Sequence, residues 1–158
     1  MARVAVAVVG SGECDADTAA LASEVGRLVA ERGAVLITGG STGVMEAASR
    51  GAHSAGGLVV GILAGSDPTA ANTWVDVAIP TGMGQLRNGL VVGSAGAVIA
   101  VAGEWGTLSE IALARKIGKP VVGLNTWQCT RFGGESDDFV RANTPLAAVD
   151  HAFELLGR

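Results

Sequence analysis

Short apolar runs rich in valine alternate with longer stretches whose apolar residues recur at helical spacing, and this alternation is the strongest constraint on the fold. Most of the runs lack polar side chains, as expected for strands that are buried on both faces. The predicted strands cover residues 4–9, 34–37, 58–63, 75–79, 97–101 and 121–124. Because right-handed crossovers place helices on both faces of a parallel sheet, the sequence predicts a Rossmann-like, doubly wound α/β fold.

Helical patterns fill the segments between these strands. We expect helices over residues 17–32, 44–55, 84–94, 107–117 and 145–156. Residues 125–143 contain Gly133-Gly134 and Asp137-Asp138 and are predicted to form a long surface loop. A chain of 158 residues suits a single domain spanning 1–158 and is too short for two well-developed ones.

Composition excludes several classes of partner. The net charge of -4 and the pI near 5.1 give no overall basic field, so we expect no nucleic-acid partner. No apolar run approaches membrane-spanning length, so we expect no membrane partner. Cys14 and Cys129 lack the spacing of a zinc site or a disulfide framework, which favours free thiols, no metal and a cytoplasmic location.

Glycine-rich loops follow three of the predicted strands, at residues 10–12, 39–43 and 103–106. They should converge, because ligands of doubly wound folds bind at the carboxyl edge of the sheet. The second loop could present backbone N–H groups and a helix's positive end to a phosphate, or it could be a turn that needs glycine for its conformation alone. Glu46, in the following helix, is either a second acidic contact or a carboxylate favoured by the helix dipole.

Arg87 and Glu110 flank the strand at 97–101 and are predicted to meet at the same edge. An arginine there can hold a phosphate or carboxylate, and a glutamate can steer water or stabilise a developing cation. The alternative for Arg87 is a surface salt bridge. The alternative for Glu110 is a capping box with Thr107, in which the glutamate accepts a hydrogen bond from the backbone N–H of the cap residue.

Three motifs in register make the sequence similar to a known superfamily: ITGGSTGVMEAASRGAHSAGG, GMGQLRNGLVVGSAGAVIAVAGEWGTLSEIALA and GKPVVGL. Together they resemble the Rossmann-like superfamily of LOG phosphoribohydrolases, once labelled lysine decarboxylases, and molybdenum cofactor carrier proteins. LOG enzymes release the base and ribose 5-phosphate from cytokinin nucleotides. The Arg of their Arg-Lys pair falls on Arg87 and the last Glu of their P-G-G-x-G-T-x-x-E motif on Glu110, so the resemblance implies catalytic roles for both.

The chain also departs from the LOG pattern. Asn88 stands where LOG enzymes have Lys, Glu46 where they have Gly, and Ala102-Gly103-Glu104 where they have Pro-Gly-Gly. These departures resemble the molybdenum cofactor carrier branch, which is implied to bind an anionic pterin phosphate without catalysis. Either the Glu104 carboxylate points outward or the loop does not hold phosphate as LOG enzymes do, because the two charges would repel.

The resulting hypothesis is a protein that binds a phosphate-bearing heterocycle, such as a nucleotide or a molybdopterin-type cofactor, and homodimerises as the resemblance implies. The alternatives are a phosphoribohydrolase that cleaves purine nucleoside 5′-monophosphates without a cofactor, and a structural or regulatory domain with a vestigial pocket. The expected ligand contacts are Gly10, Ser11, Gly39, Gly40, Ser41, Thr42, Gly43, Glu46, Arg87, Asn88, Gly103, Gly106, Thr107 and Glu110.

Overall fold

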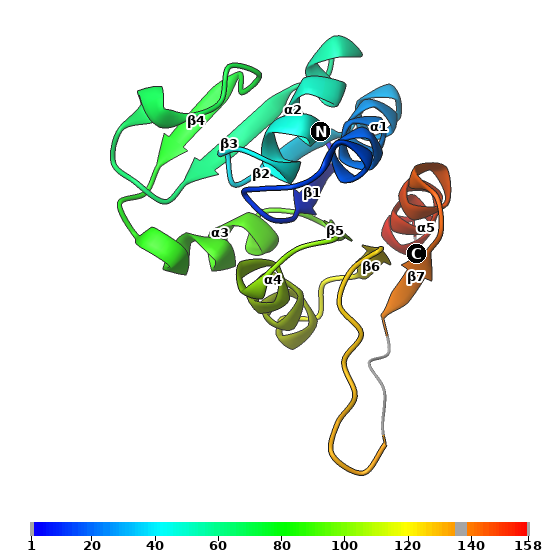
Figure 1. Cartoon of the computed structure of the whole chain (residues 1–158). Coiled ribbons are helices and arrows are strands. Elements are labelled where there is room, and N and C mark those ends of the chain that lie inside the picture. Colours follow the sequence, from blue (N-terminus) through cyan, green and yellow to red (C-terminus); the bar gives the residue numbers. More distant parts are fainter. Residues whose placement is uncertain (1, 135–138, 158) are drawn as a thin grey trace.

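A seven-stranded parallel sheet forms the centre of the molecule (Figure 1). The computed structural model describes residues 2–134 and 139–157. The strands are β1 (Ala5–Val9), β2 (Val35–Thr38), β3 (Val59–Leu63), β4 (Val77–Pro80), β5 (Ala97–Val101), β6 (Val121–Leu124) and β7 (Val140–Ala142), in the spatial order β4-β3-β2-β1-β5-β6-β7. The predicted doubly wound α/β fold is confirmed.

Helices cover both faces of this sheet. They are α1 (Ala16–Glu31), α2 (Val44–Ser54), α3 (Asn88–Gly93), α4 (Trp105–Lys116) and α5 (Pro145–Leu156), with short 3-10 turns η1 (Pro68–Ala70) and η2 (Gly84–Arg87). One apolar core joins α1, α2 and α5 to the sheet, and a second core joins α3 and α4 to the opposite face. Strands such as β1 and β5 contribute alternate side chains to the two cores, which explains why their sequences are apolar throughout.

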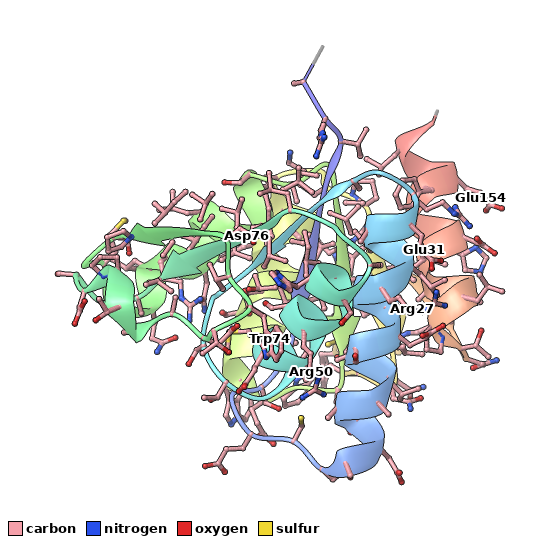
Figure 2. The ribbon with its side chains drawn as sticks, turned by 90° about the horizontal axis from the view of Figure 1, so that it is seen from above. Arg27, Glu31, Arg50, Trp74, Asp76 and Glu154 are labelled. Carbon is pink, nitrogen blue, oxygen red and sulfur yellow. The ribbon has the colours of Figure 1, made fainter. Side chains whose placement is uncertain are left out.

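Helices α1 and α2 pack against each other with their backbones in close approach. A Cβ added at Gly26 would lie 2.0 Å from the carbonyl oxygen of Ala48, and one added at Gly51 would lie 1.8 Å from that of Ser23. The outer side of α1 is charged, and Figure 2 shows Arg27 and Glu31 there. The guanidinium of Arg27 forms ion pairs with Glu31 and with Glu24.

Several predicted boundaries were wrong. Val140–Ala142 forms a strand parallel to β6, so the predicted loop over 125–143 is shorter than expected; its residues 135–138 lie outside the described part of the chain. The helix predicted from Gly84 begins as a 3-10 turn and becomes α-helical at Asn88. Helix α4 begins at Trp105, two residues before the predicted start.

The order of the strands reverses between β1 and β5. From β1 the chain proceeds outward through β2, β3 and β4, and it then returns to place β5 on the other side of β1. The loops after β1 and β5 therefore diverge and leave a crevice at the carboxyl edge, which is the usual ligand position in such sheets. No helix among the described residues is long and apolar enough to cross a membrane.

Candidate ligand-binding cleft

A cleft of about 830 Å³ lies at this reversal of the strand order. Its wall on the β1 side is formed by Val9, Gly10, Ser11, Gly12, Glu13 and Cys14. The loop after β2 adds Gly39 and Ser41, and the first turn of α2 adds Met45. The opposite wall is formed by Gln85, Arg87 and Asn88 and by Glu104, Gly106, Thr107 and Glu110. The expected convergence of the glycine loops is therefore present. We call this space the main cleft.

The loops after β1 and β2 are held together by their backbones. The N–H of Val44 donates to the carbonyl oxygen of Ser11 at 3.0 Å, and the hydroxyl of Thr42 donates to the carbonyl oxygen of Gly12 at 2.7 Å. A Cβ added at Gly43, where φ is +65°, would lie 2.3 Å from the oxygen of Ser11. Gly43 is thus required for close packing of the two loops.

Arg87 lies across the floor of the main cleft. Its Nη1 donates to the carbonyl oxygen of Ile62, at 3.1 Å, and a Cβ added at Gly39 would lie only 1.8 Å from that same nitrogen. Gly39 therefore leaves the space that the guanidinium occupies. The side chain is 8% exposed, and its Nε has no hydrogen-bond partner among the described residues. A buried donor without a partner is unfavourable unless a bound group or a water supplies the acceptor.

Thr107 provides a second buried group of the same kind. It is 2% exposed, and its Oγ1 has no hydrogen-bond partner in the described structure. The side chain packs beneath Gly103, where an added Cβ would lie 2.4 Å from Oγ1. The N-cap of α4 is Glu104, and its side chain forms no capping hydrogen bond. Thr107 is the third residue of the helix, so the capping box proposed for Thr107 and Glu110 was wrong.

Glu110 lies in the second turn of α4, 7% exposed, and lines the main cleft with Arg87. Burial raises the pKa of Glu110 to about 8, and the charge of Arg87 opposes this shift without cancelling it. Burial also lowers the pKa of Arg87, again against the influence of Glu110. No hydrogen bond or ion pair within 4.0 Å joins the two among the described residues. The carboxyl group is therefore mostly protonated at neutral pH, which leaves the charge of Arg87 without a close counterion.

The main cleft brings together most of the residues predicted from sequence. Those that line it are Gly10, Ser11, Gly39, Ser41, Arg87, Asn88, Gly106, Thr107 and Glu110. The predicted contacts that do not line it, as far as the chain is described, are Gly40, Thr42, Gly43, Glu46 and Gly103. Gly40 and Gly43 instead allow close packing of the loop after β2 on its neighbours, and Thr42 forms a hydrogen bond to the loop after β1. Gly103 packs over the side chain of Thr107.

Sequence reasoning missed four lining residues, Val9, Glu13, Met45 and Gln85. Met45 and Gln85 are each within two residues of predicted contacts, so their position along the chain carried a usable signal. Cys14 also lines the main cleft, and burial together with nearby Asp15 raises the pKa of its thiol. Glu104 is exposed and is one of the residues that line the cleft.

A second cleft of about 530 Å³ adjoins the main cleft and shares Ser11, Glu13, Cys14 and Glu104 with it. Its wall also contains Trp127, whose indole N–H donates to the carbonyl oxygen of Glu104 at 3.1 Å. The ring of Trp105 lies against that of Trp127, with centroids 5.0 Å apart, although Trp105 itself is 73% exposed. Trp105 therefore packs on an aromatic neighbour beside the clefts.

Across the described residues, no group of three histidine, cysteine or acidic side chains is placed to hold a metal ion. The two histidines lie away from the main cleft. His53, near the end of α2, is 3.4 Å from Asp76 and its ring lies beside that of Trp74. His151 is 3.4 Å from Glu154 on α5.

Solved structures similar to this chain include molybdenum cofactor proteins. The molybdenum cofactor binding protein from Rippkaea orientalis superposes with a TM-score of 0.88 at 35% identity, covering 99% of each chain. The molybdenum cofactor carrier protein of Chlamydomonas reinhardtii gives a TM-score of 0.87 at 30% identity, covering 99% of this chain and 100% of that one.

At the level of sequence, an uncharacterized protein from Archaeoglobus fulgidus is 49% identical over 124 residues, which are 78% of this chain and 82% of the relative. The sequence profile of the SLOG cluster4 family matches residues 3–149, which is nearly the whole chain. The protein therefore belongs to the SLOG cluster4 family, within the superfamily of LOG and molybdenum cofactor carrier proteins.

Proposed function

We propose that this chain binds a small heterocyclic ligand that carries a phosphate, a nucleotide or a molybdopterin-type cofactor, and acts most like a molybdenum cofactor carrier. The observation that carries the proposal is a pair of buried polar atoms without partners, Nε of Arg87 and Oγ1 of Thr107, on residues that line one cleft. Leaving such atoms unpaired is unfavourable, and an anionic ligand would supply both with an acceptor once the two buried side chains turn toward it. The similar carrier proteins support the same ligand class.

The N-terminus of α4 is the best place for the anion. The first helical N–H groups carry partial positive charge and lack partners within the helix. In α1 and α5, side chains of Asp15 and Thr144 accept hydrogen bonds from such groups. Helix α4 has no side-chain cap, and its Gly106 and Thr107 line the main cleft. A phosphate there would receive backbone donors, the Thr107 hydroxyl and Arg87 together.

The loop at 39–43 is less suited to phosphate than its glycines suggest. The N–H of Val44, the first in α2, already donates to Ser11, and the N–H of Gly40 donates to the hydroxyl of Thr38 at 3.0 Å. Two of the backbone donors around this loop are therefore occupied. We assign this loop to holding the cleft open around Arg87, through Gly39.

Replacement of Thr107 by valine tests the anion site. The two side chains have nearly the same shape, so the variant removes only the unpaired hydroxyl. Isothermal titration calorimetry should show AMP and GMP binding about tenfold more weakly, because a hydrogen bond to a charged group is worth about 1.5–3 kcal/mol. Stability should stay the same or rise slightly, since the lost group had no partner in the protein.

Ser49→Ala is the matched control for this change. Its hydroxyl is also buried, but it donates to the carbonyl oxygen of Met45 within α2 and does not line the main cleft. Ligand affinity should be unchanged in this variant. Equal affinity of the native protein and Thr107→Val for both nucleotides would remove α4 from the anion site.

Ligand affinity should also depend on pH through Glu110. An ionised carboxylate repels a phosphate, so binding should be strongest while Glu110 is protonated and should weaken as the pH rises through about 8. Between pH 7 and pH 9 we expect GMP affinity to fall about tenfold in titrations at constant ionic strength. The phosphate itself is already doubly ionised in this window, since its second pKa is about 6.

Two variants show whether Glu110 or Cys14 is the group whose titration causes this pH dependence. Glu110→Gln keeps a neutral side chain of the same size, so its affinity should be nearly constant over the window. Cys14→Ser tests the thiol that also lines the main cleft and has a raised pKa. A native affinity that does not change between pH 7 and pH 9 would contradict the proposed protonation of Glu110.

Phosphoribohydrolase activity is the second candidate, because Arg87 and Glu110, for which the resemblance to LOG enzymes implies catalytic roles, share the main cleft. The protonation of Glu110 weighs against it, since a neutral carboxyl group is poor at stabilising an oxocarbenium-like transition state. We expect no free adenine from AMP when the purified protein is followed by chromatography. Base release that disappears in Glu110→Gln would instead establish the hydrolase.

We further propose that the chain forms a homodimer through the face covered by α3 and α4. Four apolar side chains are exposed on η2, α3 and α4: Leu86 (76%), Leu90 (42%), Leu113 (39%) and Ile117 (52%). A gathering of this kind is typical of a protein interface. Sedimentation equilibrium should give twice the chain mass for the native protein and the monomer mass for Leu86→Glu with Ile117→Glu.

Leu146→Glu provides the control for the dimer, because Leu146 is 53% exposed on α5, on the other side of the sheet. This variant should keep the native mass. A monomeric native protein would overturn the homodimer.

A further inference from the structure

The second cleft differs from the main cleft in charge. Three acidic residues line it, Glu13, Asp15 and Glu104, and its described lining contains no lysine, arginine or histidine. Glu13 and Glu104 line the main cleft as well, so the difference lies in Asp15 and in the absence of a basic residue. Arg87, the basic residue in the lining of the main cleft, does not reach it. A phosphate would be repelled there, whereas a group that donates hydrogen bonds would be attracted.

The two clefts adjoin each other, because four residues line both. The unpaired Nε of Arg87 and Oγ1 of Thr107 belong to residues that line the main cleft. A ligand whose phosphate reached them would therefore extend its other end past Glu104 into the second cleft. That end is the heterocycle of the ligand.

Asp15 is held in place at the wall of the second cleft. It is the N-cap of α1, and its Oδ1 accepts the N–H of Thr18 at 2.8 Å. Hydrogen bonds from Thr18 lower the pKa of Asp15, so the side chain is an ionised group that only accepts hydrogen bonds. Its second oxygen takes no part in the capping bond.

Trp127 adds an aromatic surface to the same cleft. Its indole N–H is already bound to the carbonyl oxygen of Glu104, and its ring is packed against Trp105. What remains for a ligand is the apolar surface of the ring. A fixed aromatic group beside the fixed carboxylate of Asp15 suits a planar ring with N–H donors along one edge.

We propose that the second cleft receives the heterocycle and selects rings in which a ring N–H stands beside an exocyclic amino group, the 2-amino-4-oxo pyrimidine edge of guanine and of pterins. This inference rests on the proposed binding of a phosphate-bearing heterocycle. One carboxylate accepts both N–H groups of that edge in a bidentate pair. Adenine presents an acceptor nitrogen beside its amino group, so one of the two contacts becomes a repulsion between acceptors.

Three nucleotides with the same ribose and phosphate separate the contribution of the ring N–H from that of the exocyclic amino group. GMP carries both N–H donors, IMP carries only the ring N–H, and AMP lacks the pair. Calorimetric titration of the native protein should give affinities in the order GMP, IMP, AMP, with GMP about tenfold tighter than AMP. Equal affinities for GMP and AMP would overturn the selection of this edge.

Removal of the carboxylates should remove the preference. The variant with Glu13→Gln, Asp15→Asn and Glu104→Gln should bind GMP and AMP with affinities within about twofold. Asn caps helices as well as Asp does, so α1 should remain intact. Asp17→Asn is the control, because Asp17 lies in the first turn of α1 and lines neither cleft in the described structure. A GMP preference that survives the triple change would also overturn the proposal.

Binding of the phosphate ester of 6-hydroxymethylpterin distinguishes the two classes of ligand that carry this edge, pterins and guanine nucleotides. Affinity above that of GMP would identify a pterin as the better ligand, and affinity below it would identify a guanine nucleotide; either result supports the proposal if AMP remains weaker. If all these ligands and inorganic phosphate bind equally, the anion site stands and the ring selection fails. If none of them binds, the proposed function fails as well.

Discussion

The close approach of two loop backbones at the carboxyl edge is the constraint on which the rest of the site depends. The turn after β1 and the start of α2 are in contact through Gly10 and Gly43. An added Cβ would lie 2.4 Å from Val44 at the first position and 2.3 Å from Ser11 at the second. Any side chain larger than hydrogen would separate the loops and widen the main cleft. Much of the glycine in this region therefore serves packing, and the ligand contacts are left to Arg87, Thr107 and their neighbours.

Burial of polar groups gives the main cleft its chemistry. Arg87, Thr107 and Glu110 are all more than nine-tenths buried, yet the first two carry polar atoms without partners and the third gains its neutral form from burial. Such an arrangement is costly for an empty protein, because each unpaired group loses its hydration without regaining a hydrogen bond. It is reasonable in a protein whose working state contains a ligand.

Much of the fold and part of the candidate site could be predicted from the sequence. Apolar runs predict the buried strands, and the glycine loops that follow them mark the carboxyl edge of the sheet. The prediction that Arg87 and Glu110 meet at this edge followed from these two signals. The strand Val140–Ala142 was not, because three residues after a polar segment carry no periodic signal. The start of α4 was also misplaced, since Thr-x-x-Glu matches a local capping pattern that tertiary packing overrides here. Glu46 shows a further limit. The sequence places it in the first turn of a helix, but only the packing of that helix decides whether its side chain lines the main cleft, and Glu46 does not line it.

The backbone of Ala102, at the end of β5, has a consequence for how related proteins can diverge. Its φ of +46° lies in the left-handed region, whereas proline is confined near −65°. The LOG pattern has proline at this position, so the turn leading into α4 must follow a different path in those enzymes. Substitution of this one residue could not convert one turn into the other, because the new ring would conflict with the existing backbone. Introducing the Pro-Gly-Gly of the LOG pattern into this chain would therefore require the whole Ala102-Gly103-Glu104 turn to change its path.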